Sequence, residues 1–318
     1  MEEIIRLIHG HEHFIIAGHT GPDGDAIGSC FGLAWALEAI GKKPLVVLEP
    51  FVEKYNVIPG CKFLYHGTPE ELDVNVLIAL DCADPGRLGA ARPLFDRAKH
   101  TVCIDHHETN KGFADYNYID AKASSTAEMV FRLIEKLTAP NKDIAAAIYA
   151  GIISDTGGFR YNATAKSTME TAAQLMDIGI PFAEIYRELM HVHRFAAVKA
   201  MGLALNNCRQ AMDGRIVYSS ITREMLDSVG ACYADLDGVV EYLMGTRGAE
   251  VACLICEKQP AEIKVSLRSN GPNVGNVAVA LGGGGHHLAA GATVDGDMNE
   301  IIQRTLALLT QEILTHET

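Results

Sequence analysis

The chain has 318 residues, of which 48% are hydrophobic and 21% are charged, and its formal net charge is −13. This length allows two domains with separate cores, and the composition is that of a globular protein without a bilayer-spanning apolar run. The negative charge argues against a protein that holds long nucleic acids through a basic surface, so we expect no long duplex as a partner.

The N-terminal residues and the cysteines indicate the cellular compartment. Residues 1–4 lack the basic start of a secretory signal, and no small-residue cleavage site follows. The eight cysteines are scattered, and Cys82, Cys103 and Cys253 lie inside apolar runs, as reduced core thiols do. We therefore expect a cytoplasmic protein with no membrane partner.

The first half of the chain alternates apolar strands with helices. Strands are predicted at residues 14–18, 45–48, 74–80 and 101–104, and a helix at 26–40 ends at Gly41. Continuously apolar strands separated by helices predict a parallel sheet with helices on both faces. The functional site of such a sheet lies at the carboxyl ends of its strands.

The middle of the chain is helical, and the last third mixes strands and helices. Helices are predicted at 125–137 (opened by a capping box at Ser125), 143–153, 166–178 and 181–190, with a helical connector at 194–212. Strands at 215–221, 251–256 and 262–268, a helix at 274–281, a glycine loop at 282–287 and a helix at 298–314 follow. The fold class is therefore α/β, with an N-terminal domain at 1–190, a helical linker at 191–212 and a smaller mixed α/β domain at 213–318.

Acidic and imidazole side chains follow several of the predicted strands. They come in four clusters: His19, Asp23 and Asp25; Asp81; Asp105, His106 and His107; and Asp155. Carboxylate and imidazole donors from separate segments are the ligands that hydrolases use to hold two divalent metal ions. Each cluster alone has a structural alternative, such as an aspartate that caps a helix or a polar turn, but the combination favours a metal centre.

The motifs around these clusters are similar to those of a known family. They are His19-Thr-Gly-Pro-Asp23-Gly-Asp25, Asp81-Cys-Ala-Asp84-Pro-Gly-Arg87, Asp105-His106-His107, Asp155-Thr-Gly-Gly-Phe-Arg160 and Gly283-Gly-Gly-His286-His-Leu-Ala-Ala-Gly291. In order and spacing they resemble the DHH-family phosphoesterases with a DHHA1 C-terminal domain. The two-domain length resembles the stand-alone branch, nanoRNases that also dephosphorylate 3′-phosphoadenosine 5′-phosphate (pAp).

The resemblance implies which residues bind two Mn²⁺ ions, with Mg²⁺ or Co²⁺ as alternatives. His19 and Asp23 would hold the first ion, Asp25, His106 and Asp155 would hold the second, and Asp81 would bridge the two. His107 would contact the scissile phosphate or assist the leaving oxygen, and Asp105 would orient the histidines.

Substrate recognition would come mainly from the C-terminal domain. Gly283, Gly284 and Gly285 would leave backbone N–H groups free for a phosphate, and His286 would add a donor. Arg268 would grip a phosphate or stack on a base, whereas Arg160 would face the substrate or brace its own loop.

The function implied is hydrolysis of short oligoribonucleotides to mononucleotides, together with dephosphorylation of pAp. Three alternatives stay open: cleavage of linear or cyclic dinucleotides such as pApA and cyclic di-AMP, a RecJ-like single-strand exonuclease, and a nucleotide-binding sensor without catalysis. All six implied metal ligands are present, which favours an enzyme over a sensor. The resemblance also makes a homodimer the expected assembly.

Overall fold

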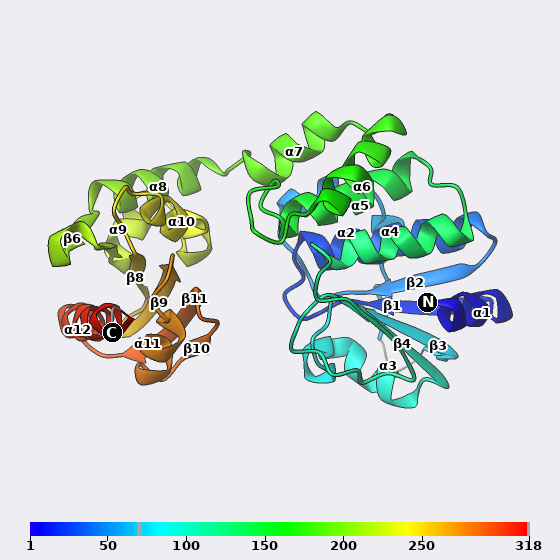
Figure 1. Ribbon diagram of the computed structural model, residues 1–318, viewed down its shortest axis with the longest axis horizontal. Coiled ribbons are helices and arrows are strands. Elements are labelled where there is room, and N and C mark those ends of the chain that lie inside the picture. Colours follow the sequence, from blue (N-terminus) through cyan, green and yellow to red (C-terminus); the bar gives the residue numbers. More distant parts are fainter. Residues whose placement is uncertain (69–71, 317–318) are drawn as a thin grey trace. The chain divides into compact units, whose positions relative to one another are not determined.

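The computed structural model describes residues 1–68 and 72–316. The chain forms two compact units, Met1–Val192 and His193–Thr318, each built from a sheet and its covering helices (Figure 1). None of the helices in these described ranges is long and apolar enough to cross a membrane.

Unit 1 is built on a five-stranded parallel sheet with the strand order β2-β1-β3-β4-β5. Its strands are β1 (His13–Ala17), β2 (Lys43–Val47), β3 (Val76–Leu80), β4 (His100–Asp105) and β5 (Tyr116–Ile119). Every residue of β3 is buried, as expected for a central strand that is covered on both faces. The predicted parallel sheet is thus confirmed, with the short edge strand β5 as an addition.

Helices cover both faces of this sheet, as predicted (Figure 1). They are α1 (Glu2–Gly10), α2 (Gly24–Ala39), α3 (Arg92–Arg97), α4 (Thr126–Leu137), α5 (Lys142–Asp155), α6 (Lys166–Asp177) and α7 (Phe182–Met190). The larger core joins one face to α2, α4 and α5, and the smaller core joins the other face to α3. Helices α2 and α5 are apolar almost all round because they lie inside the larger core.

The start of α4 differs in one detail from the predicted capping box. Ser125 caps the helix as expected, because its hydroxyl accepts a hydrogen bond from the Glu128 N–H at 3.1 Å. The Glu128 carboxylate, however, accepts from the Ser124 hydroxyl at 2.6 Å and from the Ser124 N–H at 3.3 Å. The Glu128 side chain therefore binds Ser124, the residue before the N-cap, and not Ser125 itself.

Unit 2 contains a six-stranded mixed sheet with the order β10-β11-β9-β8-β7-β6. The strands are β6 (Arg209–Ala211), β7 (Ile216–Ile221), β8 (Val251–Gln259), β9 (Glu262–Ser269), β10 (Gly284–Gly285) and β11 (Ala289–Asp295). The helices are α8 (Phe195–Asn206), α9 (Arg223–Ser228), α10 (Val239–Met244), α11 (Val274–Ala280) and α12 (Met298–His316). The predicted antiparallel pair of residues 251–256 and 262–268 is confirmed as β8 and β9.

Two predictions in the second half need correction. The stretch 194–212 is helical only to Asn206, and Arg209–Ala211 forms β6 because it pairs with β7. The glycine stretch 282–287 is not all loop, since Gly284 and Gly285 pair with Gly291 and Ala290 of β11. In both places pairing with the next strand along the chain decides the local structure.

Candidate metal centre

The loop that follows β1 carries His19 and Asp23 to the carboxyl edge of the sheet. Asp23 caps α2, because its Oδ1 accepts hydrogen bonds from the N–H groups of Asp25 at 3.0 Å and Ala26 at 3.1 Å. The His19 Nε2 lies 3.7 Å from that Oδ1, and its Nδ1 lies 2.9 Å from the Thr20 carbonyl oxygen. Asp23 therefore both caps α2 and lies beside His19.

Asp25 is fully buried at the start of α2, where the N-terminus of α4 holds its carboxylate. Its Oδ2 accepts from the Thr126 N–H at 2.7 Å, and its Oδ1 accepts from the Ala127 N–H at 2.9 Å. The Ser29 hydroxyl lies 3.3 Å from Oδ1. Free N–H groups at a helix N-terminus favour an anion, so these bonds oppose the effect of burial on Asp25 and hold its carboxylate in one orientation.

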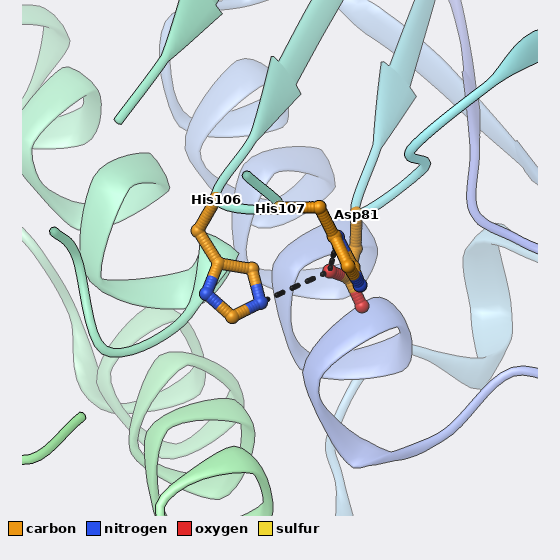
Figure 2. A group of neighbouring side chains, drawn as sticks. All are labelled: Asp81, His106 and His107. Atoms are coloured by element: carbon orange, nitrogen blue, oxygen red, sulfur yellow. Dashed lines mark ion pairs between the residues drawn. The ribbon is translucent and has the colours of Figure 1, made fainter. Parts of the chain in front are cut away.

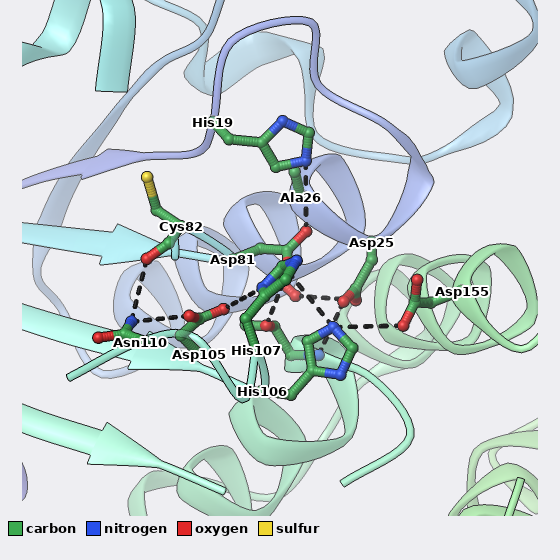
Figure 3. A network of polar contacts seen from close by, with 12 residues as sticks. His19, Asp25, Ala26, Asp81, Cys82, Asp105, His106, His107, Asn110 and Asp155 are labelled. Carbon is green, nitrogen blue, oxygen red and sulfur yellow. Dashed lines mark hydrogen bonds and ion pairs between the residues drawn. The ribbon is translucent and has the colours of Figure 1, made fainter. Parts of the chain in front are cut away.

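Asp81 lies at the centre of the cluster, directly after β3 (Figure 3). Its Oδ2 is 3.5 Å from the His19 Nε2, and its Oδ1 is 3.7 Å from the His106 Nε2. The two oxygens of one carboxylate thus face two different histidines. The Thr126 hydroxyl donates to Oδ1 at 3.1 Å, which holds Asp81 beside the helix that binds Asp25.

Asp105 and His107 form a pair at the end of β4. Their Oδ1 and Nδ1 atoms are 2.7 Å apart, and Asp105 is fully buried. The Asn110 side chain donates to the other oxygen of Asp105 at 2.7 Å and to the Cys82 carbonyl at 3.1 Å. Asn110 was missed in the sequence, although it lies only three residues after the Asp-His-His motif, because an asparagine in a polar turn carries no distinctive pattern.

His106, directly after β4, points toward Asp155, the last residue of α5 (Figure 3). The His106 Nε2 lies 3.3 Å from the Asp155 Oδ2. Its Nδ1 lies 3.3 Å from the Ala123 carbonyl oxygen, so the backbone before α4 sets the orientation of the ring.

The donors gather into three overlapping groups whose ligand atoms lie within 4.8 Å of one another: His19, Asp23 and Asp81; Asp25, His106 and Asp155; and Asp81, His106 and His107. The first two have the same members as the two ligand sets inferred from the resemblance. In the third (Figure 2), His107 joins Asp81 and His106. Carboxylate and imidazole donors from four separate segments fit a pair of divalent cations.

The protonation of the cluster reflects crowded charges. Burial lowers the pKa of His19, but hydrogen bonds to Asp23 and Asp81 outweigh this and raise it to about 10. Burial and the repulsion of Asp81 raise the pKa of Asp25 well above its usual range. Burial also raises the pKa of Asp155 to about 6, against the opposing attraction of a neighbouring histidine. The cluster therefore gathers protons, for which a bound cation would compete.

The predicted substrate-binding residues of unit 2 are positioned by β9, β10 and β11. Arg268 on β9 pairs with Glu241, with Nε 2.9 Å from Oε1. The Gly283 N–H donates to the Ala278 carbonyl at 2.8 Å. The prediction that this N–H is free to bind a phosphate is therefore wrong. A side chain at Gly283 or Gly285 would collide with the backbone of β11, whereas Gly284 has open space around it.

His286 and Arg160 are both exposed. His286 follows β10, and its backbone N–H donates to the Ala289 carbonyl at 2.8 Å. Arg160 lies in unit 1, where its Nε donates to the Gly157 carbonyl at 2.8 Å, as expected for a residue that braces its own loop.

Comparisons with known proteins agree with this description. Residues 13–152 match the model of the DHH family, N-terminal domain, and residues 213–313 match the DHHA1 domain. The chain is 32% identical to the bifunctional oligoribonuclease and PAP phosphatase NrnA of Thermus thermophilus, over 98% of this chain and 93% of the relative. It is 28% identical to the Bacillus subtilis protein of the same name, over 92% of each.

Solved structures show the same fold. An exopolyphosphatase-related protein from Bacteroides fragilis superimposes with a TM-score of 0.92 at 26% identity, over 100% of this chain and 97% of that one. The manganese complex of RecJ from Thermus thermophilus shares the fold at a TM-score of 0.58 and 13% identity, over 98% of this chain and 54% of that one. With both domain models and a full-length relative in agreement, the chain belongs to the DHH family of metal-dependent phosphoesterases and carries a DHHA1 domain.

Proposed function

We propose that this enzyme hydrolyses short oligoribonucleotides to mononucleotides and removes the 3′ phosphate of pAp. The observation that carries the chemistry is the convergence of two donor groups on Asp81, from segments that are far apart in the chain. The full-length similarity to relatives named oligoribonuclease and PAP phosphatase supports the choice of substrates.

We propose Mn²⁺ as the metal, with His19 and Asp23 at one ion, Asp25, His106 and Asp155 at the other, and Asp81 between them. When bound, such a pair of ions activates water and neutralises charge on the phosphoryl oxygens. The hydrogen bonds from the N-terminus of α4 hold the Asp25 carboxylate in one orientation for this role.

We assign His107 to the substrate phosphate or the leaving oxygen. Its Nδ1 is directed to Asp105, which leaves Nε2 as the ring nitrogen that can donate to substrate. The hydrogen bond to the buried Asp105 carboxylate raises the pKa of His107 above its usual value. Asp105 acts by orienting this ring and does not touch the substrate.

We assign recognition of the nucleotide to Arg268, Gly284, Gly285 and His286, and a lesser contact to Arg160; Gly283 is left out because its N–H is bonded to Ala278. Among the glycines of β10, Gly284 has open space around it, so a ligand can approach the backbone there. Arg268 is held in place by Glu241, which presents its planar guanidinium in a fixed orientation.

Hydrolysis assays with Mn²⁺ test the proposal. The substrates are pAp, pApA, cyclic di-AMP, a 3-mer RNA and a 24-mer RNA, and the proteins are wild type, Asp81→Ala and the exposed-site control Asp177→Ala. We expect turnover of pAp and the 3-mer by wild type and the control. We expect the hydrolysis rate of Asp81→Ala to be at least about 100-fold lower than that of wild type. Removing a residue that only hydrogen-bonds to a metal ligand already lowers activity by about 10–100-fold.

Each other outcome points to a different function. Activity confined to pApA and cyclic di-AMP would place the enzyme among dinucleotide phosphodiesterases. Equal turnover of the 3-mer and the 24-mer would favour a RecJ-like exonuclease. Nucleotide binding without any turnover would indicate a nucleotide-binding sensor that does not catalyse.

A cytoplasmic location and a homodimer are further proposals. Five cysteines of the described ranges are buried as free thiols: Cys30, Cys82, Cys103, Cys253 and Cys256. Buried free thiols suit a reducing compartment. Sedimentation equilibrium of the purified protein would distinguish a dimer from a monomer.

A further inference from the structure

Arg87 lies beside the metal centre in a position that the backbone fixes. It belongs to the short helical turn at Pro85–Ala91, which Asp84 caps by accepting from the Gly86 N–H at 2.8 Å. The Arg87 carbonyl accepts from the Thr20 N–H at 2.7 Å. The turn is thus fastened to the loop that carries His19.

The guanidinium of Arg87 reaches the outer side of His19. Its Nη2 lies 3.3 Å from the His19 Nδ1, which also lies 2.9 Å from the Thr20 carbonyl oxygen. A carbonyl can only accept, so this short contact places the hydrogen of His19 on Nδ1. The same tautomer leaves Nε2 free to bind a metal ion next to Asp23 and Asp81.

His19 therefore cannot serve as the acceptor for Arg87. A protonated Nδ1 has no lone pair to offer, so the guanidinium is next to the ring but is not bonded to it. Arg87 forms no ion pair with any residue in 1–68 or 72–316, and its side chain is exposed. Its N–H donors are available to a ligand from solution.

The charge of the site favours such a ligand contact. Five carboxylates lie within the cluster: Asp23, Asp25, Asp81, Asp105 and Asp155. Two divalent cations do not neutralise all of them, and a substrate phosphate adds further negative charge. A guanidinium offsets the repulsion, and its planar pair of N–H groups matches two phosphoryl oxygens.

We propose that Arg87 binds the non-bridging oxygens of the substrate phosphate at the metal centre. Arg87 is then a substrate-binding residue of unit 1, separate from the metal ligands and from the recognition residues of unit 2. The inference rests on the proposed function for the identity of the substrate, but its phosphate contact is testable without turnover.

The test uses Arg87→Met, Arg87→Lys and the control Arg92→Met, which removes an exposed arginine that pairs with Asp96. Mn²⁺ binding is measured by electron paramagnetic resonance, binding of inorganic phosphate to the Mn²⁺-loaded protein by calorimetry, and kcat/KM with pAp. We expect unchanged Mn²⁺ affinity and a loss of about 10–100-fold in phosphate affinity and kcat/KM for Arg87→Met. Arg87→Lys should lose less phosphate affinity and kcat/KM than Arg87→Met. The control Arg92→Met should have wild-type values of both.

Two results would overturn the inference. Wild-type phosphate affinity in Arg87→Met would show that the guanidinium does not contact the phosphate. Weaker Mn²⁺ binding in that variant would show that Arg87 acts through His19 instead. If wild type binds phosphate through Arg87 but turns over no member of the substrate panel, the proposed function fails while the role of Arg87 stands.

Discussion

Asp81 has a backbone conformation that aspartate seldom adopts, with φ of 57° directly after the central strand β3. This left-handed conformation costs free energy in a residue with a side chain, and it persists where the surroundings hold it. Here the Thr126 hydroxyl and two histidines surround the carboxylate, so the strained backbone places Asp81 between the two donor groups.

At the same scale, Asn110→Ala tests the support of His107. The change leaves the buried Oδ2 of Asp105 without its 2.7 Å donor. We expect the free energy of unfolding to fall by about 1–3 kcal/mol, measured with urea, and pAp turnover to fall about 10-fold. The control is Asn117→Ala, an exposed asparagine whose side chain bonds only the Ala114 backbone among the described residues. Equal stability of the two variants would contradict the role of Asn110.

At the scale of elements, the packing of α2 against α5 sets the separation of two predicted ligands. Helix α2 carries Asp25 and helix α5 carries Asp155. A Cβ added at Gly28 would lie 2.5 Å from the Ala147 carbonyl oxygen and 2.8 Å from the Gly151 nitrogen, both backbone atoms that cannot rotate away. Glycine at this position is therefore required by the close approach of the helices.

Gly28→Ala should force these helices apart. We expect a loss of about 1–3 kcal/mol in the free energy of unfolding, together with weaker Mn²⁺ binding in a calorimetric titration. Gly10→Ala is the control, because no atom lies within 4 Å of the Cβ that it would add at the end of α1. Unchanged metal affinity in Gly28→Ala would show that the packing of α2 against α5 does not determine how the site binds metal.

Glu128 gives a prediction that depends on pH. Burial raises its pKa, but hydrogen bonds from Ser124, Ser167 and Arg132 outweigh this and hold the pKa below its usual value of 4.5. A carboxylate with a lowered pKa stabilises the fold above its unfolded pKa, and this contribution is lost as the pH falls through its folded pKa. Glu128→Gln should therefore be less stable than wild type at pH 7, by about 1.5–3 kcal/mol.

The stability difference should shrink as the pH is lowered below about 4.5, the usual pKa of glutamate. Urea unfolding of both proteins at pH 7, 5.5 and 3.5 measures it. The exposed Glu135→Gln on the same helix is the control, with little change expected at any of these values. A difference that grows toward low pH would show that Glu128 is protonated in the fold.

At the scale of the whole molecule, each unit has its own hydrophobic cores. The cores of Met1–Val192 and those of His193–Thr318 share no buried residue. We expect the two fragments to fold separately, each with a cooperative thermal transition in circular dichroism. The first fragment should bind Mn²⁺ as the full chain does and should lose pAp turnover, because the proposed nucleotide-binding residues lie in the second. A first fragment without Mn²⁺ affinity would show that the metal site needs both units.

Local patterns in the sequence determined the elements and the kinds of atoms at the site. Apolar runs predicted β1, β3 and β4 to within two residues at each end, because buried strands have a short-range hydrophobic signal. Aspartates and histidines after those strands predicted a cluster of metal donors, because the carboxyl ends of parallel strands share one edge. Cys253 and Cys256 lie three residues apart on β8 and belong to two different cores, because such residues of a strand face opposite sides of the sheet.

Only the tertiary structure decided which groups hold those donors in place. Thr126 contacts Asp25 and Asp81 across 101 and 45 residues of sequence, and no local window relates them. Arg87 meets His19 across 68 residues of sequence. A residue's chemistry and its local periodicity are properties of the sequence itself, whereas such contacts depend on how the helices and strands pack, which is settled by the free energy of the whole fold.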